Sequence, residues 1–144
     1  MMIVQTLGPI SNNINIEGNA TDETTINDFG GEDIYTILPT LQGNVILGDN
    51  DASTINLPEG LTVDDASFRS DGVEFRINGN FLRLLGNPDQ FNFIFGGNPI
   101  NPIQGTSLTF QQTAQAFGTT VPTDPSSENQ ATNTGDISDD GTVV

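Results

Sequence analysis

The chain contains no cysteine, histidine, tryptophan or lysine. These absences exclude disulfides and thiol nucleophiles, the side chain that most often carries protons near neutral pH, and the usual protein ligands of zinc and iron. A secreted chain without disulfides needs another source of stability, and calcium suits a sequence rich in Asp and Asn. Because the residue types of most catalytic sites are missing, we expect that the protein is not an enzyme.

Positive charge is almost absent as well. Three arginines (Arg69, Arg76 and Arg83) stand against 19 Asp and Glu residues, which gives a formal net charge of -16. Such a charge repels nucleic acid and anionic membrane surfaces, so we expect neither as a partner. No apolar run approaches the roughly 18 residues that a membrane span requires, and we expect no membrane span. Residues 1–7 also lack the basic region and the length of a secretory signal, so export would depend on another signal or on one already removed.

Short β segments separated by turns are the main pattern of the sequence. The dipeptide Gly-Asn occurs five times, and both residues tolerate the positive φ angles of tight turns. Within 73–78 apolar and polar residues alternate, which is typical of a half-buried strand. We therefore predict an all-β fold with short strands, either a β-solenoid or β-roll, or a β-sandwich. The predicted strands are 3–7, 14–17, 24–27, 34–38, 44–47, 54–57, 66–68, 73–78, 81–85 and 91–95.

Two further segments differ from this pattern. Residues 107–117 place apolar side chains at helical spacing, with Ser107 or Thr109 as the N-cap and Gly118 after the last turn, which predicts one short helix. Residues 122–144 contain Pro, Ser, Thr, Asn and Asp with few apolar residues, and this composition predicts an irregular, disordered acidic tail.

The N-terminal segment is apolar and is separated from the rest by Gly8-Pro9. It is either a strand that adds to the open sheet edge of a neighbouring subunit or the first strand of its own domain. We divide the chain into an N-terminal β arm at 1–9, a calcium-binding β domain at 10–121 and the acidic tail at 122–144.

Two acidic segments between predicted strands are candidate calcium sites. Calcium takes about six to eight hard oxygen ligands, and a turn between strands supplies them from carboxylates and exposed carbonyls. The first segment lies at 24–37, with one more carboxylate in the preceding loop, and the second lies at 48–57. The alternative for both is an ordinary polar turn. The predicted calcium ligands are Asp22, Asp28, Glu32, Asp33, Asp49, Asn50 and Asp51.

The same segments carry a resemblance to a known family. The first segment resembles the D-x-I-x-D-F-x3-D-x-I-x-L segment that closes calcium-binding β-rolls of the RTX, or haemolysin-type, proteins. After Thr24, residues 25–37 read Thr-Ile-Asn-Asp-Phe, then Gly-Gly-Glu, then Asp-Ile-Tyr-Thr-Ile. Residues 48–57 are similar to a degenerate half-repeat of that kind. The complete RTX nonapeptide, G-G-x-G-x-D-x-U-x, is absent, because Gly30-Gly31-Glu32-Asp33 lacks its third glycine and its spacing. Residues 81–118 also resemble terminal modules of large secreted proteins of cyanobacteria.

The last residues add to this resemblance. Asp139-Asp140-Gly141-Thr142-Val143-Val144 is similar to the uncleaved C-terminal signals of type I secretion substrates, which often accompany RTX proteins. The resemblance implies bound Ca2+, export by type I secretion and a location outside the cell or on its surface.

These features leave three functions to consider. The first is a structural subunit of a calcium-stabilised filament, surface layer or matrix, which self-associates into a homopolymer. The alternative is a calcium-dependent adhesin or glycan-binding module that binds cell-surface glycan. Paired carboxylates can hydrolyse a glycoside, but no acid–base pair stands out here, so we do not expect an enzyme. The sequence favours the structural subunit.

Overall fold

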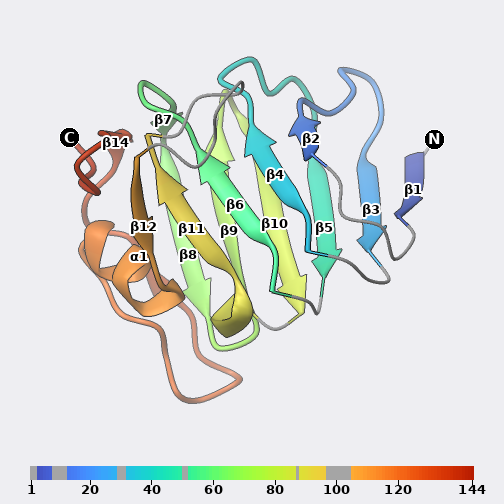
Figure 1. The fold of residues 1–144 in the computed structure, drawn as a ribbon. Helices are drawn as coiled ribbons and strands as arrows, with labels where there is room; N and C mark the ends of the chain where they lie inside the picture. The colour runs from blue at the N-terminus through green and yellow to red at the C-terminus, as the bar shows by residue number, and fades with distance from the viewer. Residues whose placement is uncertain (1–2, 8–12, 29–31, 50–51, 87, 97–104) are drawn as a thin grey trace.

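The chain folds into two β-sheets that face each other across one apolar core, with a single short α-helix at one end (Figure 1). The computed structural model describes residues 3–7, 13–28, 32–49, 52–86, 88–96 and 105–144. Sheet A has the strand order β1-β3-β5-β10-β9-β8-β13, and sheet B has the order β12-β11-β6-β4-β2. The strands of sheet A are β1 (Ile3–Leu7), β3 (Thr24–Asp28), β5 (Val45–Asp49), β8 (Asp65–Arg69), β9 (Gly72–Ile77), β10 (Asn80–Gly86) and β13 (Asn129–Gln130). Those of sheet B are β2 (Asn13–Ile16), β4 (Ile34–Ile37), β6 (Thr54–Leu57), β11 (Asn92–Phe95) and β12 (Thr106–Leu108).

Three smaller elements complete the fold. The strands β7 (Thr62–Val63) and β14 (Gly135–Asp136) pair with each other, and a 3-10 turn, η1 (Pro88–Gln90), precedes β11. The helix α1 covers Phe110–Ala116. No helix among the described residues has the length and apolar character needed to cross a membrane.

From β1 to β6, successive strands lie alternately in sheet A and in sheet B, and each of β1 to β4 pairs in parallel with the strand two places later in the chain. Ile3 pairs with Thr24, and Thr24 pairs with Val45 in sheet A. In sheet B, Asn13 pairs with Ile34, and Ile34 pairs with Thr54. Equivalent positions therefore come together at a regular spacing along the chain, and like side chains form rows across each sheet.

These rows make the core. The inner face of sheet B carries two apolar rows, Ile14-Tyr35-Ile55-Phe93 and Ile16-Ile37-Leu57-Phe95. Opposite them, sheet A presents Ile26, Leu47, Leu84, Val73 and Phe68. All but Ile14 are buried. Each fully buried side chain of this size contributes about 1.5–3 kcal/mol through the removal of apolar surface from water.

The predicted all-β fold with one short helix is confirmed, but a regular roll is not formed. After β6 the chain leaves the alternating pattern and builds β7, β8 and β9, and β10 then returns to pair in parallel with β5. Sheet A is parallel from β1 to β10 and antiparallel from β10 to β13. The sheets neither close on themselves nor continue as a solenoid, because the antiparallel strands β8 and β9 interrupt the parallel repeat.

The predicted helix is present with the predicted signals. Thr109 is the N-cap: its hydroxyl accepts from the Gln112 N–H, and the Gln112 side chain accepts from the Thr109 N–H, which forms a capping box. Gly118 follows the helix with φ of 74°, a conformation that favours glycine. Phe110 and Phe117 are buried, so the helix presents its apolar face to the core.

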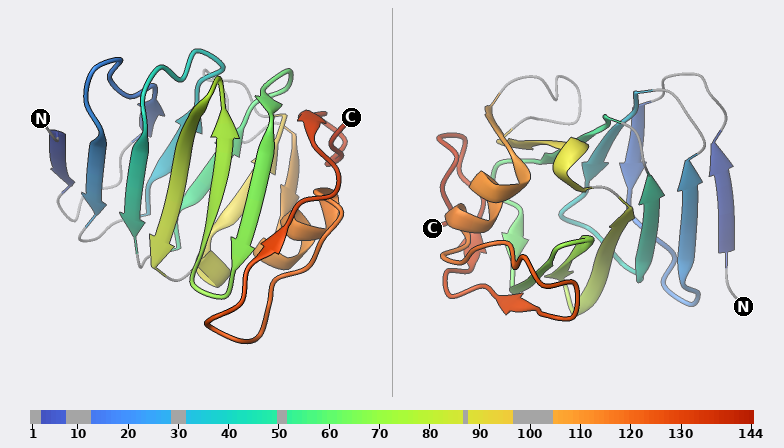
Figure 2. Two further views of the ribbon diagram at one scale, coloured as in Figure 1. Left: turned by 180° about the vertical axis from the view of Figure 1, so that it is seen from behind. Right: turned by 90° about the horizontal axis from the view of Figure 1, so that it is seen from below.

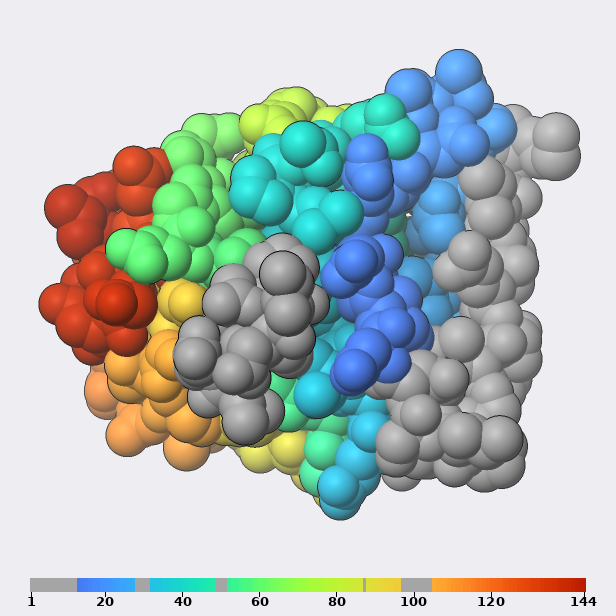
Figure 3. Space-filling model, turned by 45° about the horizontal axis from the view of Figure 1, so that its top comes forward, coloured from blue at the N-terminus to red at the C-terminus, as the bar shows by residue number. Residues whose placement is uncertain are grey.

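The C-terminal segment is ordered against the body, in contrast to the disorder predicted from its composition. Strand β13 pairs with β8, β14 pairs with β7, and Ile137 and Val143 are buried in the core. The Asn133 amide donates to the carbonyls of Ala116 (3.1 Å) and Val143 (3.0 Å). Composition did not predict this order, because the segment is held mainly by backbone and amide hydrogen bonds. Only two large apolar side chains, Ile137 and Val143, anchor it in the core. In Figure 3 these C-terminal residues, in red, lie against the green segment that contains β7.

Residues 3–7 form an edge strand of the body. Of the two alternatives for this segment, the structure shows the strand paired with its own chain, through β3. Residues 8 and 9, which the sequence marks as the boundary of an arm, lie outside the described residues.

Loops at one end of the strands are stacked backbone to backbone. The Gln42 N–H donates to the Glu17 carbonyl (2.9 Å), and the Thr24 N–H donates to the Asn44 carbonyl (2.9 Å). A Cβ at Gly43 would lie 2.0 Å from the Asn19 carbonyl oxygen, so this position has no room for a side chain. The close approach of these two loops therefore requires glycine at 43.

We predict that Gly43→Ala lowers the free energy of unfolding by about 3 kcal/mol, because the stacked loops must separate to admit the methyl group. Gly48→Ala is the matched control, since the nearest atom to a Cβ there is 3.8 Å away. Its effect should stay within about 1 kcal/mol. Urea unfolding of both variants measures this, and equal values would contradict the stacking.

A second prediction concerns the turn at 138–142. Hydrogen bonds from the Thr142 hydroxyl (2.5 Å) and then from Ser138 lower the pKa of the Asp140 carboxyl. A group with a lowered folded pKa stabilises the fold above its unfolded pKa, and this contribution is lost as the pH falls through the folded value. The turn should therefore loosen in acid at a pH below the ordinary aspartate range. Replacing Thr142 with Val should move the pKa of Asp140 up toward its ordinary value in an NMR titration; an unchanged pKa would contradict the assignment.

Candidate functional site

The described residues that flank the two acidic segments, 28 and 32–33 in the first and 49 and 52–53 in the second, come together where the chain passes from sheet A to sheet B. We call these flanking residues the stacked turns. Asn27 of β3 pairs with Gly48 of β5, so Asp28 and Asp49 follow at neighbouring positions in the ladder. Adjacent strands in a sheet are about 4.8 Å apart. The backbone register therefore places these two predicted ligands next to each other, at the C-terminal ends of two neighbouring strands of sheet A.

The far sides of the two turns are also joined. The Asp33 N–H donates to the Ser53 hydroxyl (3.1 Å), and the Thr54 N–H donates to the Asp33 carbonyl (2.8 Å). Asp33 is only 1 % exposed and Ser53 is fully buried, whereas Glu32 is exposed. These contacts hold the start of β4 against the start of β6.

The predicted calcium ligands divide into three groups. Asp28, Glu32, Asp33 and Asp49 belong to the two stacked turns. Asn50 and Asp51 lie outside the described residues. Asp22 is not with the others: it precedes β3, whereas Asp28 ends it, and the five residues of the strand span roughly 15 Å. Within the described segments, no three acidic side chains are grouped closely enough to hold a metal ion.

The two sheets end together at the N-terminal end of the molecule. Strand β1 is the last strand of sheet A, and β2 is the last strand of sheet B (Figure 1). Among the described strands, none pairs with the outer edge of either. We call this end, formed by β1, β2 and the loop at 17–19, the open end.

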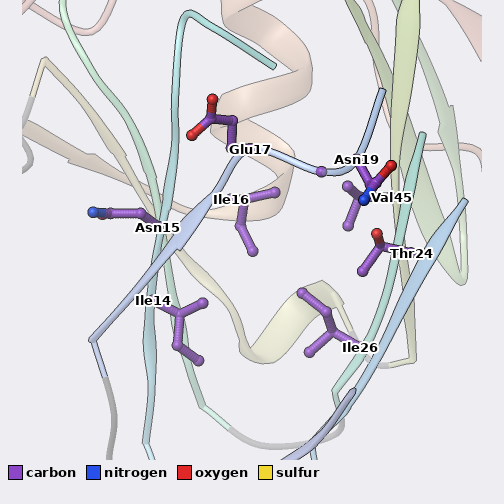
Figure 4. A pocket seen from close by; sticks show the side chains of 9 residues that line it. Ile14, Asn15, Ile16, Glu17, Asn19, Thr24, Ile26 and Val45 are labelled. Atoms are coloured by element: carbon purple, nitrogen blue, oxygen red, sulfur yellow. The ribbon is translucent and has the colours of Figure 1, made fainter. Parts of the chain in front are cut away.

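A hollow of about 290 Å³ lies between the sheets at the open end. Figure 4 shows Ile14 and Ile16 of β2 on one side and Ile26 and Val45 of sheet A on the other, directed into a common space. Asn15 points away from it. Ile16, Ile26 and Val45 are core residues, so the hollow reaches the apolar core, whereas Glu17, Asn19 and Thr24 give the rest of its lining a polar character.

The opposite end is closed by α1 and the C-terminal segment, as the right-hand view of Figure 2 shows. Phe110 lies 5.8 Å from Phe68 of sheet A and 6.0 Å from Phe93 of sheet B, measured between ring centroids. Phe117 lies 5.6 Å from Phe75 and 6.0 Å from Phe95. The helix thus joins both sheets and fills the space between them. We call this the closed end.

Sequence patterns identified the acidic turns but missed the open end. A signal was present, because Ile-x-Ile at 14–16, Tyr-x-Ile at 35–37 and Ile-x-Leu at 55–57 are the same apolar pair repeated along the chain. Comparison with known proteins finds no matching family model, no matching curated protein and no matching solved structure.

Proposed function

We propose that this protein is an extracellular structural subunit that binds calcium and associates with copies of itself through the open end. The observation that carries the proposal is the contrast between the two ends. One end has a helix and a C-terminal segment packed between the sheets. The other has two edge strands, and one of them, β2, lines a hollow together with core residues of sheet A. Edges of this kind pair readily with another chain. We assign the protein no catalytic role.

The outer edge of β2 is well suited to pairing. The Leu38 N–H donates to the Ile16 carbonyl, so the backbone groups of Ile16 point inward toward β4. Backbone direction alternates along a strand, so the N–H and C=O groups of Asn13 and Asn15 point outward. A second chain can take up these groups without disturbing the pairing between β2 and β4.

Contact between two open ends is favoured over stacking of an open end on a closed end. The edge strands of the closed end, β12 and β13, have only three and two residues. They can form few backbone hydrogen bonds with β1, which has five residues, or with β2, which has four. A contact between identical ends has two-fold symmetry and joins two copies.

Calcium is the stabilising ion that we propose for the stacked turns. The register sets Asp28 beside Asp49, and Glu32 and Asp33 follow in the first turn. Like charges on neighbouring strands repel, and a divalent cation with oxygen ligands would offset that repulsion. The resemblance to RTX proteins and the net charge of -16 support the same proposal.

We predict that calcium raises the melting temperature and that EDTA lowers it. An ion that binds only the folded state at 100 times its Kd stabilises by about 2.7 kcal/mol. The double variant with Asp28→Asn and Asp49→Asn should lose the calcium response and should melt above the wild type in EDTA, because the repulsion is gone. Asp22→Asn is the matched control and should keep the response. Identical melting of the wild type with calcium and with EDTA would refute calcium binding.

For the open end, Asn15→Pro should abolish association through the edge of β2, so that assemblies become smaller than those of the wild type, while the subunit still folds. Proline removes the outward N–H and is tolerated where a strand edge faces solvent. Asn15→Thr is the control, because threonine keeps the N–H and suits a strand. Sedimentation velocity with calcium present measures the mass of each variant, and circular dichroism checks the fold. A wild type that stays monomeric at every calcium concentration would contradict the proposal.

A further inference from the structure

All cationic side chains of the chain lie on one surface. Arg69, Arg76 and Arg83 come from three adjacent strands, β8, β9 and β10. Their strand neighbours Phe68, Phe75, Leu82 and Leu84 are buried, so the arginines are on the outer face of sheet A. In the left view of Figure 2, sheet A is at the front and no described segment crosses these three strands. We call this surface the arginine face; its outward residues are Asp65, Ser67, Arg69, Glu74, Arg76, Phe81, Arg83 and Leu85.

The centre of the arginine face is held in place by ion pairs and an aromatic ring. Arg83 Nη2 lies 2.7 Å from Glu74 Oε1, and Arg76 Nη2 lies 3.6 Å from Glu74 Oε2. The guanidinium carbons of Arg83 and Arg76 are 4.7 Å and 5.8 Å from the centroid of the Phe81 ring. Both are within the range of cation–π attraction. One carboxylate and one ring therefore fix two arginines that remain 42 % and 48 % exposed.

A hollow of about 430 Å³ adjoins this centre. Its lining includes Arg69, Arg83 and Leu85, with Gly72 contributing no side chain. Leu85 is 41 % exposed and is one of two large apolar side chains exposed among the described residues. An apolar side chain beside half-exposed guanidinium groups is typical of the composition of protein interfaces, where arginine is enriched.

The charge pattern of the arginine face indicates a second copy of this chain as its partner. Two copies of a chain with a net charge of -16 repel each other over most orientations. On the arginine face the three cations alternate with Asp65 and Glu74, and at its border Asp71 and Glu128 lie beside Arg69. When such a mixed pattern meets its own copy across a two-fold axis, the arginines of each copy can oppose carboxylates of the other. This is the part of the described surface on which like copies can meet with opposite charges in contact.

We propose that the arginine face is a second contact between copies of this chain, with two-fold symmetry and electrostatic character. The proposal rests on the proposed function and deepens it. Two-fold contact at the open end alone joins two copies and stops. A filament or layer requires a second contact on each subunit, and the arginine face provides one on a different surface from the open end.

The test uses the two contacts in combination. Arg69→Glu with Arg76→Glu reverses charge on the arginine face at two residues whose ion pairs, at 3.6–4.0 Å and half exposed, contribute little to folding. This variant should stop at two copies in sedimentation velocity, whereas the wild type forms larger assemblies. Arg69→Lys with Arg76→Lys keeps the charge and should assemble like the wild type. Circular dichroism melting checks that every variant is folded.

The Asn15→Pro variant isolates the arginine face. It should form pairs whose Kd rises about tenfold as salt increases from about 0.05 M to about 0.5 M, because exposed charges are screened. A monomeric Asn15→Pro protein beside a wild type that forms pairs would overturn the arginine face and leave the open end standing. Charge-reversed protein that still forms large assemblies would overturn it as well. A wild type that never associates would overturn both contacts.

Discussion

The in-register parallel pairing of successive strands is the constraint on which the rest of this structure depends. Because Thr24 lies beside Val45 and Ile34 lies beside Thr54, each later residue of β3 and β4 lies beside the equivalent residue of β5 and β6, at the spacing of adjacent strands. The apolar rows of the core, the stacked loops at Gly43 and the stacked acidic turns all follow from that one register. A slip by one residue would turn the core rows outward, so the hydrophobic pattern and the register enforce each other.

Local pattern predicted much of the fold. Each of the ten predicted strands overlaps a strand of the structure, and α1 begins after Thr109, one of the two predicted caps. These features depend on residues close together in the sequence. Strands β7, β12, β13 and β14 were missed because two or three residues carry no alternation to detect. The order of the strands in the sheets was also beyond reach, since the insertion of β7 to β9 hides the repeat.

The candidate sites divide in the same way. The two acidic segments could be predicted as candidate sites because each is one continuous segment next to a strand, and their role in binding calcium stays a prediction. Asp22 is close to Asp28 in sequence, yet the extended strand between them carries it to the other end of β3. The arginine face needed topology: Arg76 and Arg83 meet over Phe81 only because a hairpin sets β9 against β10 in one particular register. The open end likewise depends on topology, since it exists only because both sheets stop at the same place.

The closure of the core by α1 and the C-terminal segment has a consequence for the order of folding. The phenylalanines of β8, β9 and β11 receive their covering rings from residues 110 and 117, and the neighbouring edge is completed by residues 129–143. These covering residues are synthesised after the strands that they close. A growing chain therefore carries an uncovered row of aromatic rings until residues 105–143 emerge, and stable folding of this domain has to wait for them. Strands that are synthesised first thus gain little stability before the segment that covers them is available.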